Sequence, residues 1–296
     1  MPIGDLPEYP EARELSLRDK EALTELFTRL QPQISEYTFT NLYAWKSSNR
    51  CLLSSIEGEP LILREYDEVL HLMPPITTSI VEALKEMRRM GEIPPIYGLL
   101  KDEVEALAGM GFKVKPDRDN WDYVYSVEDL IELRGSKFRV KRQNIYKCLS
   151  EHSCEYAQID RSNITECWEF YERWCRIRDC HKDLELKNEG EAIREILDNY
   201  DALPLRGAVI YVDGSLEAFT IGEQLNRDTA VIHIEKANPN IKGLYQLINN
   251  WFCRNHLAEF KWVNREQDLG IPGLRRAKMD YNPHHFIEKY VAHPPS

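Results

Sequence analysis

The chain has 296 residues, of which 43% are hydrophobic, and carries a formal net charge of −11. This hydrophobic content builds the core of one large domain or of two ordinary ones, which excludes a disordered chain. The acidic balance argues against general affinity for nucleic acid or an anionic membrane, and no stretch approaches the roughly 18 apolar residues of a membrane span.

The cysteines and the first residues bear on metal binding and compartment. Seven cysteines without a Cys-x-x-Cys pair do not suggest a disulfide framework or a thiolate metal site. Cys167, Cys175, Cys180 and His181 come closest to a cluster of metal ligands. The helical spacing of the neighbouring apolar residues, however, predicts that Cys167 and Cys175 lie in the core. Met1–Asp5 lacks the basic and apolar regions of a signal peptide, so we expect a cytoplasmic protein that binds no metal.

The first half of the chain predicts two helices, three short strands, and then helix, strand, helix and strand. Glu57-Gly58-Glu59 supplies the turn between the first two strands. Apolar residues from Ile80 to Met87 fit the period of a helix that ends near Gly91. The other predicted elements are Glu21–Leu30, Phe39–Lys46, Cys51–Ile56, Leu61–Arg64, Val69–Met73, Ile96–Leu99, Asp102–Ala108 and Trp121–Tyr125.

The second half begins with three helices and then repeats this order. Asp213-Gly214 is the strongest short hairpin signal in the chain, and a helix is predicted from about Ile241. The other predicted elements are Val127–Leu149, Ile164–Ile177, Glu189–Tyr200, Ala208–Val212, Leu216–Glu223, Thr229–Glu235, Phe260–Val263, Gly273–Met279 and His285–Tyr290.

The repeated order predicts a structural duplication. We expect an α/β (α+β) fold of two tandem acetyltransferase-like domains, residues 1–126 and 127–296. Each domain would hold a mixed, mainly antiparallel sheet flanked by helices, and the second would carry the donor site.

Four stretches carry a resemblance to a known family: Ser35–Trp45, Trp121–Tyr125, Lys141–Ile145 and Asn264–Arg275. Together they resemble the soluble C-terminal domain of bacterial phosphatidylglycerol lysyltransferases, and more closely a stand-alone branch of that family. The resemblance spans nearly the whole chain. It implies a relationship to transferases that move an amino acid from aminoacyl-tRNA to a lipid or a peptidoglycan precursor.

The segment between the strand at 229–235 and the following helix is the first candidate site. In the fold that the resemblance implies, this segment accepts the pyrophosphate of an acyl-CoA donor through the amides of the first helical turn. The segment contains a single lysine and a single glycine, where an acyl-CoA site is richer in arginine and glycine. Two interpretations stay open, an anion-binding turn and a plain capped helix start. The residues concerned are Asn238, Asn240, Lys242 and Gly243.

The strand before this segment suggests a catalytic base. Alternation places Thr229, Val231, His233 and Glu235 on one face. Acylation of an amine needs a base that removes a proton from the amine, and a partly buried Glu235 can accept this proton. For Glu235, the alternatives are a solvent-exposed carboxylate and a carboxylate paired with Lys236. For His233, the alternative is a half-buried side chain whose hydrogen bonds are satisfied within the fold.

One stretch of this acidic chain has a positive net charge. Residues 134–147 contain six cations and no acid. On a continuous helix Arg134, Lys137 and Lys141 share one side, with Arg142 at the margin. Such a row fits phosphates, as in a tRNA acceptor arm or another phosphate-bearing donor. The alternative is a solvated face whose cations pair with the protein's own acids.

The loop and short helix after the strand at 260–263 supply further candidates. Arg275 and Lys278, three residues apart, can contact an anionic donor, and Asp268 can orient one of them. Asn264 and Arg265 belong to the same donor-binding candidate. In the implied fold, a tyrosine near position 281 protonates a leaving group. Tyr281 is therefore a catalytic candidate, with packing under the last strand as the alternative.

These features lead to a hypothesis of acyl transfer, from aminoacyl-tRNA to an amine or hydroxyl acceptor. One alternative is an N-acyltransferase that uses acyl-CoA, and another is a non-catalytic binding protein that retains the fold. The chain lacks the membrane helices of the full-length lipid-modifying enzymes, which leaves peripheral contact with a membrane open.

Overall fold

A computed structural model of the chain describes residues 3–66 and 68–295. The chain forms two compact units, and neither is continuous in sequence. The first contains Met1–Asp122, Gln267–Pro272 and Phe286–Ser296, and the second contains Tyr123–Glu266 and Gly273–His285. A single boundary after residue 126 would assign the two C-terminal segments to the second domain, whereas here they pack with the first unit.

The first unit is built on one seven-stranded sheet in the order β1-β2-β3-β4-β5-β14-β6. Its neighbours are antiparallel except for the parallel pair β4 and β5. The elements are β1 (Arg13–Glu14), α1 (Lys20–Leu30), α2 (Phe39–Ala44), β2 (Arg50–Ile56), β3 (Glu59–Tyr66), β4 (Val69–Leu72), α3 (Ile80–Met90), β5 (Ile96–Leu99), α4 (Lys101–Gly109), β6 (Lys113–Pro116) and β14 (Tyr290–His293).

Local sequence accounts for much of this unit. The predicted turn between β2 and β3 is present at Glu57 and Gly58. Both residues have positive φ. The predicted apolar side of α3 is buried, with Leu84 and Met87 completely inaccessible to solvent. These two side chains belong to the core cluster that also contains Leu61 of β3. Burying this stripe against the sheet stabilises both elements.

The second unit also holds a seven-stranded sheet, in the order β13-β7-β12-β11-β10-β9-β8. Here β11 and β12 are the parallel pair. The elements are β7 (Asp122–Ser126), α5 (Val127–Glu132), α6 (Arg139–Glu151), β8 (Cys154–Gln158), α7 (Ile164–Arg178), α8 (Leu184–Asp198), β9 (Arg206–Val212), β10 (Ser215–Asn226), β11 (Thr229–Ala237), α9 (Leu244–His256), β12 (Trp262–Asn264), α10 (Pro272–Met279) and β13 (His285–Ile287).

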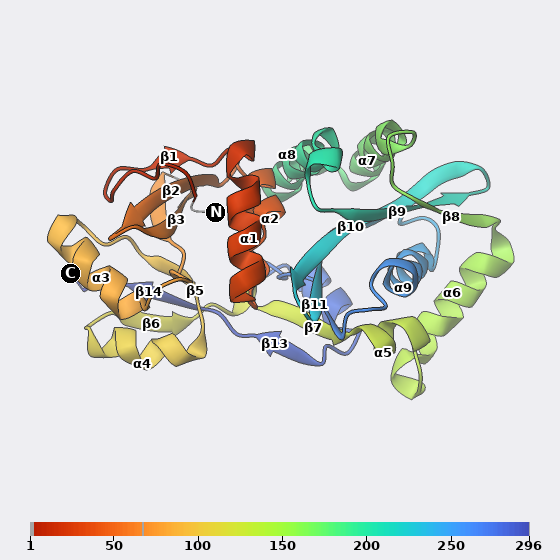
Figure 1. The fold of residues 1–296 in the computed structure, drawn as a ribbon. Coiled ribbons are helices and arrows are strands. Elements are labelled where there is room, and N and C mark those ends of the chain that lie inside the picture. The colour runs from red at the N-terminus through yellow and green to blue at the C-terminus, as the bar shows by residue number, and fades with distance from the viewer. Residues whose placement is uncertain (1–2, 67, 296) are drawn as a thin grey trace. The chain divides into compact units, whose positions relative to one another are not determined.

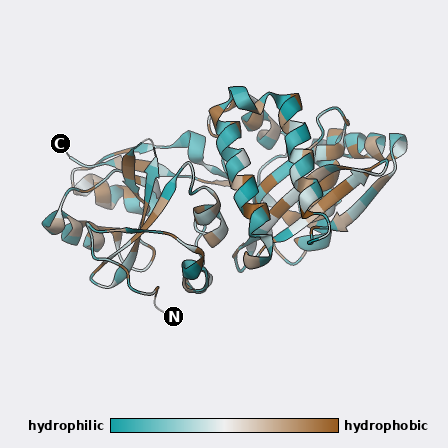
Figure 2. Cartoon of the chain, turned by 90° about the horizontal axis from the view of Figure 1, so that it is seen from above, coloured by the Kyte–Doolittle hydropathy of each residue, from teal (hydrophilic) through white to brown (hydrophobic). Residues whose placement is uncertain are grey.

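Helices cover both faces of the second sheet. Figure 1 shows α7 and α8 on one face and α9 on the other, with α5 and α6 packed on α9. In Figure 2, brown hydrophobic residues run along the strands of this sheet, while much of the helix surface is teal. The two mixed, mainly antiparallel sheets with flanking helices confirm the predicted fold class. None of the helices in the described part of the chain has the length and apolar character that crossing a membrane requires.

The structure differs from the predicted duplication at the ends of both halves. The predicted last strand of the first half is β7, which pairs with β12 in the second sheet. The predicted strand His285–Tyr290 is divided: β13 joins the second sheet, and β14 lies between β5 and β6 in the first. Periodicity identifies a strand, but hydrogen bonds to distant segments decide which sheet it joins.

The predicted helix Val127–Leu149 is also interrupted. Leu133 and Gly135 both adopt positive φ, so α5 ends at Glu132 and α6 begins at Arg139. The sequence contains a signal for this break, because glycine after a helix commonly ends it.

Candidate active site

The candidate site lies where two parallel strands of the second unit part. β11 and β12 pair over three residues, from Thr229 opposite Trp262 to Val231 opposite Asn264. β12 ends at that point, whereas β11 continues to Ala237. Side chains join the two segments beyond this point.

The central contact is a buried ion pair. Nη2 of Arg265 donates to Oε1 of Glu235 over 2.7 Å. Nδ2 of Asn249, on α9, donates to the second carboxylate oxygen over 2.8 Å. The side chains of Arg265 and Glu235 are only 13% and 11% exposed. Both oxygens of Glu235 are therefore occupied, and the carboxylate fixes the direction of the guanidinium.

Aromatic rings and two lysines surround this pair. The guanidinium carbon of Arg265 lies 4.7 Å from the ring centroid of Tyr281 and 5.4 Å from that of Tyr125. Nζ of Lys141, from α6, lies 4.3 Å from the Tyr281 ring centroid. Nζ of Lys278 donates to the backbone carbonyl of Arg265, and the hydroxyl of Tyr125 donates to the carbonyl of Lys278 over 2.9 Å. Cation–π contacts thus hold the cations where water is scarce.

Two polar atoms in this cluster lack a partner. Within the described part of the chain, Nη1 of Arg265 and the hydroxyl oxygen of Tyr281 are buried without a hydrogen bond. A buried polar group without a partner costs free energy, so such atoms mark a place for a ligand or an ordered water. Both groups can donate a hydrogen bond, so a ligand that satisfies both of them presents an acceptor atom such as a carbonyl oxygen.

Burial and charge set the protonation states here. Burial raises the pKa of Tyr281, which the nearby Arg265 opposes only in part. Burial lowers the pKa of Lys141, an effect that Asp280 opposes and Arg265 reinforces. Burial by itself lowers the pKa of Arg265, but the charge of Glu235 and the surrounding groups raise it above its ordinary value. Tyr281 therefore remains a hydrogen-bond donor at neutral pH.

Five of the predicted site residues meet in this cluster. They are Glu235, Arg265, Lys278, Tyr281 and Lys141. Lys141 reaches the cluster from the basic stretch, which the sequence assigns to a separate phosphate patch.

The segment before α9 forms hydrogen bonds within itself and with the neighbouring strand β10. The side-chain oxygen of Asn238 accepts from the amide of Asn240, and its Nδ2 donates to Glu217 over 2.8 Å. Gly243 has a φ of 93°, and a Cβ there would lie 2.0 Å from the carbonyl oxygen of Asn144. Asn238 thus closes a turn at residues 238–240, whereas α9 begins after Gly243 without a side-chain capping bond. Anion binding here, including the exposed Lys242, stays a prediction.

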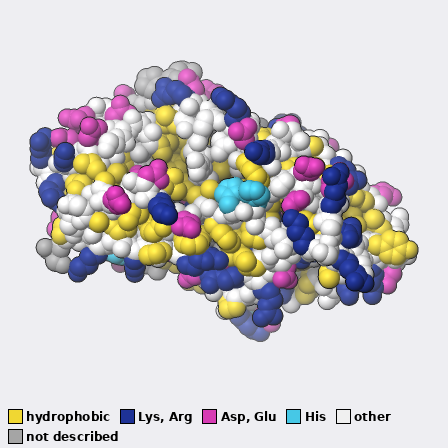
Figure 3. All heavy atoms as spheres, turned by 90° about the horizontal axis from the view of Figure 1, so that it is seen from below, with side chains coloured by type: hydrophobic (Ala, Val, Ile, Leu, Met, Phe, Trp, Pro, Cys, Tyr) yellow, Lys and Arg dark blue, Asp and Glu magenta, His cyan; other side chains and the backbone are white. Residues whose placement is uncertain are grey.

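The basic stretch is not one helical row. Arg134 and Lys137 precede α6, so they do not share a helical side with Lys141. Nζ of Lys137 lies 2.8 Å from Asp129, and Arg142 donates to the carbonyl of Gly135 over 2.8 Å. Leu149, near the end of α6, is 43% exposed. In Figure 3, Lys and Arg side chains lie in separate groups with acidic and hydrophobic side chains between them.

The remaining predicted donor residues have other surroundings. Asp268 is fully buried in the first unit, where Nη1 of Arg118 lies 3.1 Å from its carboxylate. The buried side-chain oxygen of Asn264 accepts from the amide of Glu266 over 2.8 Å. Arg275 is half-buried on α10. The predicted role of Asp268 in orienting Arg275 or Lys278 stays a prediction.

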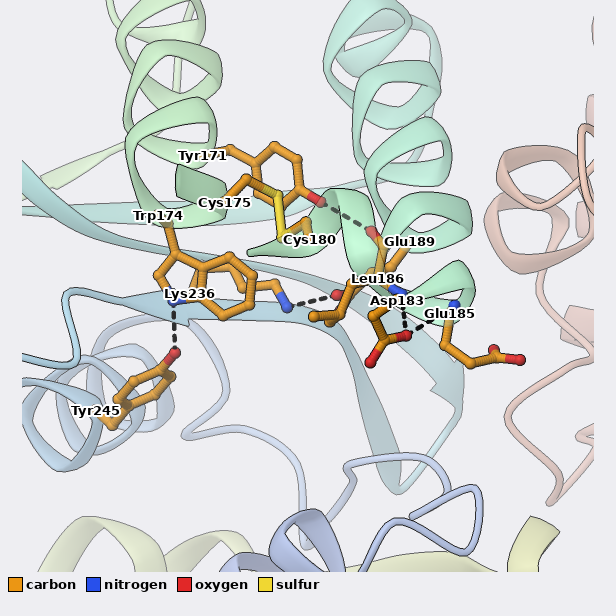
Figure 4. Close-up of a disulfide and its surroundings, with 10 residues drawn as sticks. All are labelled: Tyr171, Trp174, Cys175, Cys180, Asp183, Glu185, Leu186, Glu189, Lys236 and Tyr245. Atoms are coloured by element: carbon orange, nitrogen blue, oxygen red, sulfur yellow. Dashed lines mark hydrogen bonds and ion pairs between the residues drawn. A yellow bond between two sulfur atoms is a disulfide. The ribbon is translucent and has the colours of Figure 1, made fainter. Parts of the chain in front are cut away.

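The other face of β11 holds a disulfide and a buried lysine. Cys175 and Cys180 form a disulfide at the end of α7, which corrects the expectation of an unpaired core cysteine at position 175. Figure 4 shows this bond beside Lys236, whose Nζ lies 2.6 Å from Glu189 and 4.2 Å from the Trp174 ring centroid. The alternative pairing of Lys236 with Glu235 is therefore wrong. Among the described residues, no group of three or more potential ligands could hold a metal ion.

The sequence did not identify Asn249 and Tyr125 as parts of the site. Asn249 and the adjacent Asn250 interrupt the otherwise buried apolar side of α9, and they are 1% and 7% exposed. Two amides inside a hydrophobic stripe are the signal that could have revealed this contact, because buried polar side chains need partners.

Comparison with known proteins identifies the family. The family model described as phosphatidylglycerol lysyltransferase, C-terminal, matches residues 27–293. The chain belongs to this family. The match confirms the resemblance carried by the four sequence stretches.

Relatives of this phosphatidylglycerol lysyltransferase C-terminal family member extend the comparison. An uncharacterized protein of Mycoplasmoides gallisepticum is 22% identical over 172 residues, which is 57% of this chain and 55% of that protein. The match thus spans about half the length of the curated relative. A conserved protein of unknown function from Bacteroides thetaiotaomicron VPI-5482 is 29% identical with a TM-score of 0.88, covering 95% of this chain and 98% of that one.

Two further structures share the fold of this family member. L-PGS from Bacillus licheniformis has a TM-score of 0.62 at 14% identity, covering 98% of this chain and 93% of that one. A tandem GNAT protein from the clavulanic acid biosynthesis pathway has a TM-score of 0.50 at 12% identity, covering 97% and 99%. The predicted tandem acetyltransferase-like fold is confirmed.

Proposed function

We propose that this chain transfers an aminoacyl group from tRNA to an amine or hydroxyl acceptor, with its reacting site around Arg265. The observation that carries the proposal is the unpartnered Nη1 of Arg265 beside the unpartnered hydroxyl of Tyr281. Membership in the phosphatidylglycerol lysyltransferase C-terminal family supports the same class of reaction.

The residues suggest how the transfer would proceed. Nη1 of Arg265 and the hydroxyl of Tyr281 would donate to the carbonyl oxygen of the ester, where negative charge develops during attack. The acceptor nitrogen or oxygen would bond to the carbonyl carbon and lose its proton to Glu235. The bond to the tRNA ribose oxygen would break, and that oxygen would take a proton from Tyr281 or water.

The donor is tested by supplying two activated groups separately. We expect the chain to release label from tRNA charged with radioactive amino acids when phosphatidylglycerol vesicles or small amines are present. Labelled acetyl-CoA should not be consumed. Consumption of acetyl-CoA without loss of label from tRNA would favour the acyl-CoA alternative, and turnover of neither donor would favour a non-catalytic protein.

The basic stretch gives a binding test of the same proposal. Combined alanine replacements of Lys137, Lys141 and Arg142 should weaken tRNA binding and lower the salt dependence by about one unit per lost phosphate contact. Filter binding at several salt concentrations measures both. Alanine at Lys182 and Arg194, which form surface ion pairs in the same unit, is the matched control. Unchanged affinity in the triple variant would remove the basic stretch from tRNA binding.

Glu235 is tested by an isosteric change. Glu235→Gln should lower kcat by about 100-fold, since an amide cannot accept the proton. Its oxygen can still accept from Arg265, while its amide nitrogen cannot accept the bond that Asn249 donates to Glu235. Glu169→Gln, at an exposed position of α7, is the control. Unaltered turnover in Glu235→Gln would exclude Glu235 as the base.

A further inference from the structure

His233 lies at a β-bulge beside the candidate site. The register of β10 and β11 shifts so that Ile221 pairs with Ile234 and Gly222 with Ile232, which leaves His233 as the extra residue. Bulges redirect side chains, and glycine permits close approach of the strands. A Cβ on Gly222 would lie 2.3 Å from a carbonyl oxygen of β11.

Two carboxylates occupy the two nitrogens of the His233 ring. Nε2 lies 2.8 Å from Glu223, on β10, and Nδ1 lies 2.8 Å from Glu266, in the turn after β12. The side chains of His233 and Glu223 are 3% and 4% exposed, and that of Glu266 is 15% exposed. An ionised carboxylate only accepts hydrogen bonds, so this geometry favours a ring that donates from both nitrogens, which is an imidazolium.

Electrostatics favours the same protonation state. Burial by itself lowers the pKa of His233, but the hydrogen bonds and charges of Glu223 and Glu266 raise it to about 10. The next charges along the same segments are Glu235 and Arg265, which pair with each other, and Lys278, which binds the carbonyls of the turn.

The turn that His233 binds is the one that carries Arg265. Glu266 follows Arg265 directly and has a φ of 56°, a left-handed conformation that needs support from its surroundings. Its amide donates to Asn264, and its carbonyl accepts from the amide of Tyr123 over 3.2 Å. The His233–Glu266 bond ties this turn to β11 two residues before Glu235.

We propose that His233 is a positioning residue that bridges Glu223 and Glu266 and thereby holds the turn carrying Arg265 against β11. In this role it keeps the guanidinium in place on Glu235 without touching the substrate. Its effect on catalysis rests on the proposed function, whereas its effect on Arg265 does not.

Two variants separate the bridge from general stability. His233→Gln retains one donor and one acceptor, so it leaves one of the two carboxylates without a donor. Glu223→Gln keeps the contact with Glu266 but removes one of the charges that stabilise the imidazolium. His256→Gln, at a half-buried histidine near the end of α9, is the matched control.

Nuclear magnetic resonance of the intact chain tests the bridge independently of turnover. Both ring nitrogens of His233 should carry protons at pH 8, and Glu223→Gln should lower the pKa of the ring. In folded His233→Gln, the Nε–H of Arg265 should exchange with water at least about tenfold faster than in the wild type or in His256→Gln. An unprotonated ring nitrogen at pH 8, or unchanged exchange at Arg265, would overturn the proposal.

Kinetics then tests the consequence for transfer. His233→Gln should lower kcat/KM by roughly 100-fold, because a displaced guanidinium loses its alignment. Glu223→Gln should move the alkaline limb of the pH–rate profile to lower pH. If the wild type transfers nothing from tRNA or CoA, the proposed function fails, but the exchange measurement still decides the role of His233.

Discussion

Replacement of Arg265 by glutamine is expected to lower kcat/KM for aminoacyl transfer by about 100- to 1000-fold. That range is typical for removal of one preorganised donor from a site that stabilises developing negative charge. The guanidinium presents a buried, unpartnered Nη1 while its Nη2 is held by Glu235. Steady-state kinetics with charged tRNA measures the change.

A second substitution keeps this test valid if the glutamine variant does not fold. Arg265→Lys retains the charge, but a single ammonium cannot bind Glu235 and present a second fixed donor. We therefore expect a folded protein with at least about tenfold lower kcat/KM. Arg194→Gln, at an exposed ion pair of α8, should retain wild-type kinetics. Wild-type kinetics in both Arg265 variants would contradict the assignment of the site.

Replacement of Lys289 by methionine is expected to have the largest effect on stability. Lys289 is 1% exposed, and its Nζ lies 2.6 Å from Glu36 and 2.7 Å from the fully buried Asp122. Gln267 donates to the same two carboxylates. Without the ammonium, the buried carboxylate of Asp122 and the partly exposed carboxylate of Glu36 face each other, which should cost about 3–5 kcal/mol in the free energy of unfolding. Urea unfolding of the whole chain measures the loss.

The pH dependence of that loss provides an internal check. Burial raises the pKa of Glu36, although Lys289 opposes this effect. A carboxyl whose pKa is raised in the folded state disfavours folding at high pH, and the penalty falls as it takes up a proton. The loss in Lys289→Met should therefore shrink as the pH is lowered toward 4, and adding Glu36→Gln should restore part of it. A loss no larger than that of the exposed control Lys115→Met would refute the predicted role of this cluster.

Local sequence signals predict most of the helices and strands, but neither the shortest strands nor all of the strand partners. Asp213 and Gly214 form the predicted hairpin turn, both with positive φ. By contrast, β8 was not predicted, because Cys154–Gln158 is a short strand that joins the sheet only by pairing with β9. Such pairing depends on segments that are distant in sequence, and periodicity contains no information about it.

The site could be predicted in part for a similar reason. Arg265 and Tyr281 stand out through residue type and resemblance, and they meet Glu235 because strand and loop geometry bring them together. Lys141 was assigned to a phosphate patch, since a continuous helix from residue 127 hides the break that reorients α6. The two amides in the apolar stripe of α9 indicate that Asn249 needs a buried partner, but its contact with Glu235 depends on the tertiary structure.

The placement of β14 affects the order in which the chain folds. This strand, residues 290–293, lies between β5 and β6 in the first sheet, although β5 ends at residue 99 and β6 at residue 116. During synthesis, β5 and β6 leave the ribosome before β14 is made, so the edges of both strands that pair with β14 lack their hydrogen-bond partner until then. The first sheet therefore cannot be completed before residues 290–293 have been synthesised, and its contacts are among the most distant in the sequence.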